Sequence, residues 1–207
     1  TAYEIRPRDW SSDVCSSDLC DVVIPHAQRC CGALAAHAGD ESAAASMARA
    51  NIDAFESFGI DEFDAIVINS AGCGAQIKSY DHVLRHDPAY AARARRFVSK
   101  VEDIAEFLAR VGLTAQLGRV DRTITYQDAC HLVHGQRIRS QPRELLNQVP
   151  GVKLIEMRDS ARCCGSAGIY NILQPDTSAK VLEAKIEHVS ATGADCVVAS
   201  NPGCLLQ

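Results

Sequence analysis

Two short motifs, each containing cysteine beside glycine, occur twice in this chain. Arg29–Gly32 reads Arg-Cys-Cys-Gly and recurs as Arg162–Gly165, and Asp64–Cys73, which ends in Gly-Cys, recurs as Asp195–Cys204. Adjacent cysteines are poorly placed to form an ordinary disulfide with each other. Their recurrence in the same order predicts two copies of one structural unit, each built around thiol chemistry.

Each copy alternates short apolar runs with amphipathic segments. This alternation of strand and helix predicts an α/β fold of two pseudo-repeated small units with mostly parallel sheets, and with the cysteines on loops at the C-terminal ends of strands. We expect strands at 22–24, 65–68, 123–126, 152–156 and 196–199. We expect helices at 41–58, after Cys73, from Pro88 to Gly112, and at 132–139, 143–148 and 176–192.

The chain divides into three predicted segments. Residues 20–118 form the first cysteine-rich unit and residues 119–207 the second. Residues 1–19 form a suspect leader, because 8–19 have no hydrophobic period, contain the only Trp and resemble translated sequencing adapter. A genuine polar linker is the alternative interpretation of this segment.

Aligning the two copies sorts the ten cysteines. Cys196 aligns with Ala65 inside a strand and is expected to be buried, Cys20 aligns with Lys153 and is a weak ligand candidate, and Cys15 falls in the leader. The remaining thiols are the candidate metal and cofactor ligands: Cys130, Cys163, Cys164 and Cys204 as one set, and Cys30, Cys31 and Cys73 as the other.

The first set is one cysteine short of the second. Cys130 lies 33 residues before Cys163, and the same offset from Cys30 falls before residue 1. The chain also stops just after Cys204, where a helix is expected to begin. We therefore expect a fragment truncated at both ends, with the fourth thiol of the first unit upstream of it.

Four thiolates converging from strand ends are a suitable ligand set for an iron–sulfur cluster. Gly32 and Gly165, and likewise Gly72 and Gly203, are expected to let the backbone turn with positive φ beside a bulky cofactor. Zinc is an open alternative because four thiolates also satisfy Zn²⁺. A further alternative is that the paired cysteines are simply buried thiols or form a strained vicinal disulfide.

Three polar residues accompany the second cysteine set. His131 and His134 follow Cys130 and are interpreted either as donors or proton carriers near a cluster, or as ordinary surface or capping residues. Asp128, two residues before Cys130, is expected to orient that loop.

Charge and cysteine content limit the class of protein. A net charge of −5 argues against a nucleic-acid partner. No apolar run approaches the roughly 20 residues that span a bilayer. Ten cysteines without a secretory signal favour a reducing compartment, so we expect a cytoplasmic protein.

The double motif resembles a known family. Cys-Cys-Gly followed by Gly-Cys, in duplicate, resembles the cysteine-rich CCG domain of the heterodisulfide-reductase superfamily. Within it, segments 28–34, 69–74, 126–132, 163–168 and 200–204 look like the iron–sulfur subunits of glycolate oxidases. The likeness covers about residues 20 to 207.

The resemblance implies an iron–sulfur (4Fe–4S) electron-transfer subunit of a flavin-dependent 2-hydroxy-acid (glycolate) dehydrogenase. FAD-binding partner subunits would oxidise the substrate, and a quinone or other acceptor would take the electrons at the inner membrane face, where the complex would be peripheral. The family pattern often ends in CxxC, whereas Cys73 and Cys204 stand alone here, which leaves the kind of centre open.

Several related assignments also fit the motifs. Lactate-utilisation, glycerol-3-phosphate dehydrogenase and heterodisulfide-reductase-type subunits share the superfamily pattern. A zinc-stabilised docking module and a thiol-based disulfide reductase are alternatives from other functional classes.

Overall fold

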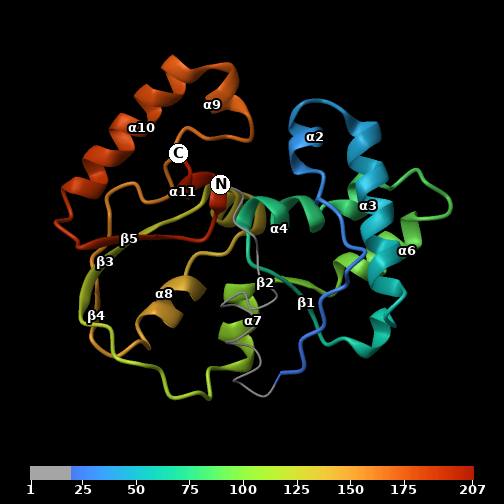
Figure 1. The fold of residues 1–207 in the computed structure, drawn as a ribbon, viewed down its shortest axis with the longest axis horizontal. Helices are drawn as coiled ribbons and strands as arrows, with labels where there is room; N and C mark the ends of the chain where they lie inside the picture. Colours follow the sequence, from blue (N-terminus) through green and yellow to red (C-terminus); the bar gives the residue numbers. More distant parts are fainter. Residues whose placement is uncertain (1–19) are drawn as a thin grey trace.

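The structure, a computed structural model, describes residues 20–207 (Figure 1). Its strands are β1 (Ile66–Ile68), β2 (Val101–Asp103), β3 (Arg122–Gln127), β4 (Val152–Leu154) and β5 (Cys196–Ala199). Its longer helices are α3 (Glu41–Glu56), α4 (Ala71–Ile77), α6 (Ala91–Val98), α7 (Ile104–Val111), α8 (Gln141–Leu146) and α10 (Pro175–Ser190). The short ones are α2 (Ala33–His37), η1 (Ile60–Glu62), α5 (Tyr80–Val83), η2 (His131–Gln136), α9 (Tyr170–Leu173) and α11 (Pro202–Leu205).

The strands form two separate parallel sheets. In the first, β1 pairs with β2, with Ile66 opposite Val101. In the second, β3 is the central strand and pairs in parallel with β4 and β5. Two small units with parallel sheets confirm the predicted fold class. The predicted boundary at residues 118 and 119 stays a prediction.

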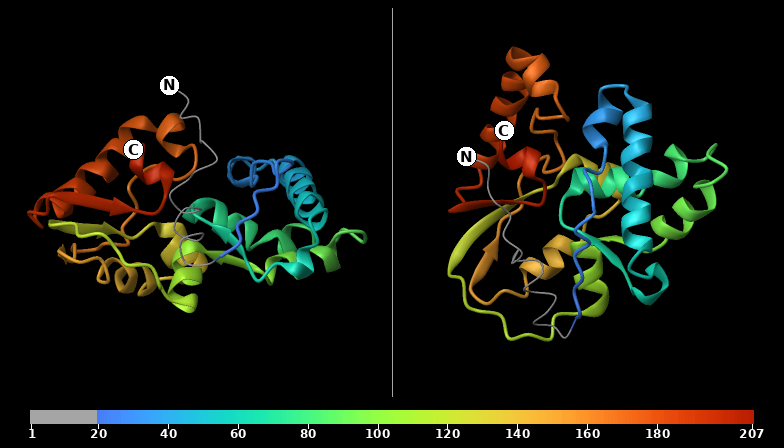
Figure 2. Two further views of the ribbon diagram at one scale, coloured as in Figure 1. Left: turned by 60° about the horizontal axis from the view of Figure 1, so that its bottom comes forward. Right: turned by 45° about the vertical axis from the view of Figure 1, so that its right-hand side comes forward.

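Each cysteine pair is followed by the same order of elements. A short helix and a sixteen-residue helix come first, α2 and α3 in one copy and α9 and α10 in the other. A strand and a cysteine-bearing helix follow, β1 and α4 or β5 and α11, and the first copy adds the short helix η1 before its strand. Figures 1 and 2 show α3 and α10 on opposite sides of the molecule, with α4 between them.

The two units meet where β1 and β5 end. The Ala71 N–H donates a 3.2 Å hydrogen bond to the carbonyl oxygen of Ser200. The side chains of Ala71, Ala129, Leu132 and Ile138 pack together there, with Cys204 against them. Because parallel strands place their C-terminal ends at one edge of a sheet, this packing gathers cysteine-bearing segments of both units at the centre of the molecule.

The largest apolar cluster lies in the first unit. Ile52, Tyr80 and Phe97 are fully buried, and the rings of Tyr80 and Phe97 stack with centroids 5.9 Å apart. Full burial of a side chain such as Phe97 contributes roughly 1.5–3 kcal/mol to folding. This cluster fixes α3, α5 and α6 against the first sheet and so supports the first cysteine pair.

The predicted helix from Pro88 to Gly112 is wrong. It is divided into α6, β2 and α7, because residues 101–103 leave the helical path and pair with β1. A capping box at Asp103, in which the side chain accepts from Ala105 N–H and Glu106 reaches back to the Asp103 N–H, starts α7.

The strand predicted at residues 22–24 is also wrong. Val22, Val23 and Ile24 form neither helix nor strand and are exposed. Apolar character alone is insufficient, since a strand also needs a neighbour to pair with. Within residues 20–207, the first sheet consists of β1 and β2 only.

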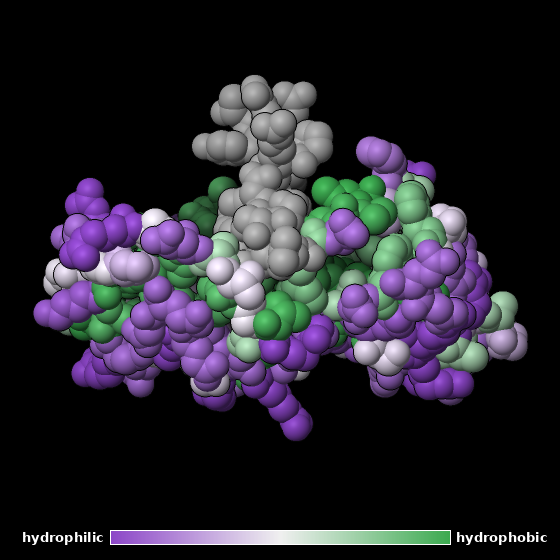
Figure 3. Space-filling view, turned by 90° about the horizontal axis from the view of Figure 1, so that it is seen from below, coloured by the Kyte–Doolittle hydropathy of each residue, from purple (hydrophilic) through white to green (hydrophobic). Residues whose placement is uncertain are grey.

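The surface is largely hydrophilic on the face seen in Figure 3, with hydrophobic residues gathered towards the middle. Among the described residues, none of the helices combines the length and the apolar character that crossing a bilayer demands.

Candidate metal centre

The second cysteine pair lies in a loop that packs against the start of α10. Gly165, which follows the pair, has a φ of 100°, and a Cβ atom there would lie 2.6 Å from the carbonyl oxygen of Ser178. The Ser178 hydroxyl donates a 3.0 Å hydrogen bond to the Gly165 carbonyl. Any side chain at position 165 would combine a strained backbone with a close contact, so glycine is what allows this approach.

The first pair repeats this packing. Gly32 has a φ of 82°, and a Cβ atom there would lie 3.2 Å from the Cα of Ala44. Ala44 and Ser178 are each the fourth residue of their helix, so both loops approach the same place on equivalent helices. The predicted positive φ is confirmed at Gly32 and Gly165.

The same prediction is wrong for Gly72 and Gly203. Both lie inside helices, because α4 begins at Ala71 and α11 at Pro202. Cys73 therefore lies within the first turn of a helix, where we expected the helix to follow it. A Cβ atom at Gly72 would lie 3.3 Å from Asn201 Oδ1, so close approach between the units is what favours glycine there.

Four thiols of the second unit lie next to one another in a chain. Cys130 lies three residues after the end of β3, and Cys204 lies in α11 shortly after β5. Cys130 contacts Cys163, Cys163 contacts Cys164, and Cys164 contacts Cys204. The structure thus brings together the four residues that the repeat assigned to one set.

The thiols in this chain alternate in acidity. The thiols of Cys130 and Cys164 hold the pKa of Cys163 far below its ordinary value. The Cys164 thiol and then the Asn201 amide lower the pKa of Cys204 to about 6, against the effect of burial. The pKa values of Cys130 and Cys164 are raised because their neutral thiols act as donors. Negative charge therefore accumulates on Cys163 and Cys204.

N–H groups point at the same two sulfurs. The Gly165 N–H donates to Cys163 Sγ at 3.4 Å, and Asn201 Nδ2 donates to Cys204 Sγ at 3.3 Å. Such donors stabilise thiolates and tune the potential of iron–sulfur ligands. An all-thiol donor set with N–H donors fits an iron–sulfur cluster chemically.

The thiols are not gathered around one point. In residues 20–207, no three Cys, His, Asp or Glu side chains are arranged as a single metal ion requires. A single zinc ion would need such convergence, with thiolates about 2.3 Å from the metal. A cluster carries several irons and its own bridging sulfides, so it suits thiols arranged in a chain better.

In the first unit the structure brings Cys31 and Cys73 together. The Cys31 thiol and the Ser70 side chain lower the pKa of Cys73 to about 6, while burial opposes the shift. The pKa of Cys31 is raised because its thiol hydrogen-bonds to Cys73 and is buried. Cys30, the third predicted member, is exposed beside them.

Buried polar side chains hold the first pair in place. Asn51 of α3 accepts a 2.7 Å hydrogen bond from the Arg29 N–H and donates at 3.1 Å to the Cys30 carbonyl. The Tyr80 hydroxyl donates to the Cys31 carbonyl at 3.0 Å. Burial, the first cause, raises the pKa of Tyr80, so the hydroxyl stays protonated as a donor.

Ser70 and Asn201 occupy equivalent positions, each three residues before the last cysteine of its unit. Each side chain hydrogen-bonds to that cysteine, Cys73 or Cys204. Asn201 Oδ1 also accepts a 3.0 Å hydrogen bond from the Gly72 N–H. Asn201 thus links a thiol of the second unit to the cysteine-bearing helix of the first.

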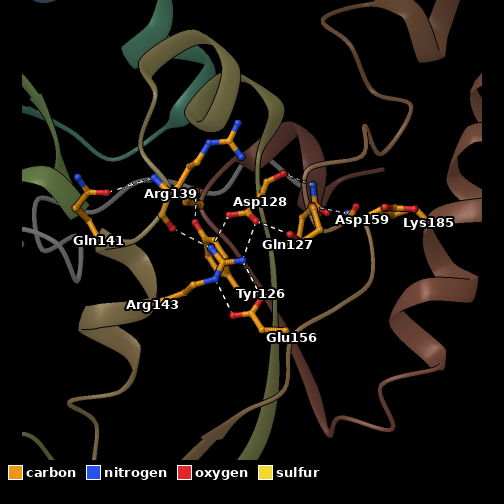
Figure 4. Close-up of polar contacts among 11 residues, drawn as sticks. Tyr126, Gln127, Asp128, Arg139, Gln141, Arg143, Glu156, Asp159 and Lys185 are labelled. Carbon is orange, nitrogen blue, oxygen red and sulfur yellow. Dashed lines mark hydrogen bonds and ion pairs between the residues drawn. The ribbon is translucent and has the colours of Figure 1, made fainter.

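Asp128 lies at the centre of an ion-pair network (Figure 4). Its carboxylate oxygens accept hydrogen bonds of 2.9 and 2.8 Å from Arg143 and one of 2.6 Å from the Ser160 hydroxyl. Arg143 also pairs with Glu156. Burial alone would raise the pKa of Asp128, but Arg143 and Ser160 lower it overall. The network ties the loop before Cys130 to the loop before Cys163, the orienting role expected of Asp128.

The two histidines differ. His131 Nδ1 lies 3.7 Å from Cys130 Sγ, and its ring lies 5.5 Å from that of His37 in the first unit. Burial and then His37 lower the pKa of His131, which keeps its ring neutral. His134 is exposed on η2, as a surface residue would be.

The structure places two of the cysteines that the alignment of the copies did not assign as ligands. Cys20 is half-buried beside the cluster of Ile104, Phe107 and Leu108. Cys196 was expected to be buried but is exposed, because among residues 20–207 β5 pairs with β3 alone. Cys15 and the leader lie outside the described residues.

The sequence interpretation missed Asn51, Tyr80, Ser178, Lys185 and Asn201. The available signal was a polar residue on the apolar stripe of an amphipathic helix. Asn51 follows Ala44 by seven positions, and Lys185 follows Ser178 by seven. A polar residue at such a position is buried and needs a specific partner.

Comparisons with known proteins identify a family and several relatives of this chain. The sequence model of the family described as "Cysteine-rich domain" (CCG) matches residues 5–78 and 124–207. The chain is 42% identical over 190 residues to the "Probable glycolate oxidase iron-sulfur subunit" of Bacillus subtilis (strain 168), covering 91% of this chain and 42% of that protein. It thus spans about two fifths of that relative.

Relatives with a second name also match. "Lactate utilization protein A" of Shouchella clausii (strain KSM-K16) is 31% identical over 188 residues, covering 90% of this chain and 77% of that protein. The protein of the same name from Bacillus cytotoxicus is 29% identical with the same coverage. The first family match begins at residue 5, and the predicted leader at residues 1–19 stays a prediction. Two matched copies, each containing its Cys-Cys-Gly pair, show that the chain belongs to the cysteine-rich CCG domain family.

Proposed function

We propose that this chain is an iron–sulfur electron-transfer subunit of a complex that oxidises 2-hydroxy acids. The observation that carries the proposal is the chain of four neighbouring thiols, Cys130, Cys163, Cys164 and Cys204, with N–H donors aimed at two of them. When bound, an iron–sulfur cluster accepts and releases single electrons. The protein holds the thiolates, stabilises their charge and buries Cys164.

The relatives' names support the coarser assignment and favour glycolate as the donor. The chain is 42% identical to a probable glycolate oxidase subunit and 31% identical to a lactate utilization protein. We propose that FAD-bearing subunits oxidise glycolate and pass electrons to this chain, which delivers them to a quinone or another acceptor. We further propose a cytoplasmic location, peripheral at the inner membrane face.

Anaerobic reconstitution with iron and sulfide tests the assignment directly. We expect iron and sulfide to bind, visible absorption to appear, and an EPR signal to change on one-electron reduction. Stoichiometric zinc without visible absorption, in protein purified without added metal, would favour the docking-module alternative. A folded chain that binds no iron would refute the proposal.

The donor is tested separately in the assembled complex. Glycolate, lactate and glycerol-3-phosphate are supplied in turn, and bleaching of the iron–sulfur absorption is followed. We expect glycolate to reduce the centre fastest. Faster reduction by lactate would move the assignment to the lactate-utilisation relatives and leave the electron-transfer role unchanged.

A further inference from the structure

The long helices of the two units turn equivalent positions towards different surroundings. α3 and α10 each have sixteen residues, so their positions can be compared one by one. The eleventh residue is buried in both, where Asn51 bonds to the backbone of the first cysteine pair and Lys185 Nζ donates to the Ser160 carbonyl at 2.7 Å. The twelfth residues differ in burial, since Ile52 is 0% and Ile186 is 50% exposed. A helix face that is core in the first unit is therefore surface in the second.

In the first unit, α5, α6 and β2 cover this face. Both α5 and α6 contact α3, and Ile52 belongs to one buried cluster with Tyr80 and Phe97. The strand β2 extends the cover by pairing with β1, where Ile66 lies opposite Val101. All three covering elements come after α4 in the chain, one directly after another. A single segment, 80–103, thus closes both the helix face and an edge of the sheet.

In the second unit, the described residues leave the equivalent helix face and sheet edge open. A groove on the outer face of α10 is lined by Leu182, Glu183, Ile186, Glu187 and Ser190. Within residues 20–207, β5 pairs with β3 alone, and Val197 is 44% exposed whereas its counterpart Ile66 is 3% exposed. Figures 1 and 2 show α10 and β5 at the same end of the molecule. Open strand edges and exposed apolar groups are typical of surfaces that bind further polypeptide.

The charges at the margin of this face are equivalent as well. The Asp53 carboxylate of α3 pairs with Arg93 of α6 and accepts a 2.9 Å hydrogen bond from the Tyr90 hydroxyl. Glu187 is the thirteenth residue of α10, as Asp53 is of α3. None of the ion pairs within residues 20–207 includes Glu187 or its neighbour in the groove, Glu183. An apolar groove with an acidic margin is complementary to an amphipathic helix whose apolar face is flanked by Lys or Arg.

We propose that the groove on α10 and the outer edge of β5 bind a segment of the same polypeptide C-terminal to Gln207, an amphipathic helical part followed by a β-strand. The order of elements points to this source, because α11 is the counterpart of α4, after which α5, α6 and β2 follow. A crossover that leaves β5 on the α10 face is right-handed, like the one from β4 to β5, and so reaches the edge of β5 away from β3. The helical part brings apolar side chains to Ile186 and a Lys or Arg to Glu187, and the strand pairs in parallel with β5.

The test compares the 207-residue chain with the full chain read to the stop codon of its own gene. Ile186→Gln is made in both, and Ile172→Gln is the matched control because Ile172 of α9 is 74% exposed and lies outside the groove. We expect Ile186→Gln to leave the urea midpoint of the 207-residue chain unchanged and to lower that of the full chain by about 1 M. Ile172→Gln should change neither. Hydrogen exchange of the β5 amides should be slower in the full chain.

The other outcomes identify a different occupant or none. An unchanged midpoint for Ile186→Gln in the full chain would overturn the inference. If that variant does not fold, Ile186→Val should give a smaller fall in the midpoint, and no fall would overturn the inference equally. Slow exchange of β5 in the 207-residue chain that is lost on dilution would assign the surface to a second copy, and slow exchange only with the FAD-bearing subunits present would assign it to a partner. Either result would overturn the inference and leave the iron binding of the proposed function untouched.

Discussion

Replacing Gly165 by alanine should destabilise the protein more than the same change at any glycine that has positive φ but open surroundings. A left-handed backbone costs an L-residue roughly 1–2 kcal/mol. The new Cβ would also lie 2.6 Å from the Ser178 carbonyl oxygen, in a buried contact that must move. Overpacking of this kind costs about 1–3 kcal/mol. The sum predicts a loss of about 2–5 kcal/mol in the free energy of unfolding.

Two other glycines separate the cost of backbone strain from the cost of the close contact. Gly39 has a φ of 82° with nothing within 4 Å of an added Cβ, so Gly39→Ala reports backbone strain alone. Part of that strain is offset, by about 0.4–1 kcal/mol, because alanine reduces the freedom of the unfolded chain. Gly32→Ala should fall between them, since its Cβ would lie 3.2 Å from the Ala44 Cα.

Urea unfolding of the metal-free variants, followed by circular dichroism, measures these differences. The predicted order of destabilisation is Gly165→Ala, then Gly32→Ala, then Gly39→Ala. If Gly165→Ala cost no more than Gly39→Ala, the loop would not need its close approach to α10. The shape of the second cysteine loop would then not depend on glycine at position 165.

Three further substitutions test the polar groups. In urea unfolding, Asp103→Asn should stabilise the chain at pH 7 but not at pH 4. Burial raises the pKa of Asp103 to about 6, so its ionisation costs stability as the pH rises towards and through that value. An equal effect at both pH values would contradict this. Arg143→Leu should cost about 3–5 kcal/mol by leaving Asp128 buried and unpaired. Arg143→Leu should also weaken the loss of unfolding free energy at low pH, since the lowered pKa of Asp128 adds stability that is lost as the pH falls through it. An unchanged loss of stability at low pH would refute the pairing. Asn51→Ala should cost about 1–3 kcal/mol by unpairing the Arg29 N–H and the Cys30 carbonyl, and thermal unfolding unchanged from the parent would show that the contact is dispensable.

The elements that the sequence predicted well have strong local patterns. Helix α3 has an apolar stripe and an Asp40 cap that accepts from the Ala43 N–H, and β3 alternates threonines with Ile124 and Tyr126, β-branched and aromatic residues that favour strands. The segment 88–112 was wrongly predicted as one helix because Phe97, Val101 and Ile104 keep helical spacing, although residues 101–103 pair with β1. Pairing with a distant strand is a tertiary fact that periodicity does not contain.

The repeat predicted which thiols meet, but not what surrounds them. Alignment of the copies grouped Cys130 with Cys163, and the structure places them in contact. It did not identify Asn51 or Lys185, because their importance depends on which helix face packs against the cysteine loops. Cys196 was misplaced for the same reason, since the outer edge of β5 is uncovered within residues 20–207.

The central claim is that the four thiols of the second unit hold one iron–sulfur centre. Iron content after anaerobic reconstitution of Cys204→Ser and Cys196→Ser tests it most directly, because both cysteines lie on the segment formed by β5 and α11. We expect Cys196→Ser to bind as much iron as the parent and Cys204→Ser to lose the iron of the second set. Equal iron in the two variants would contradict it.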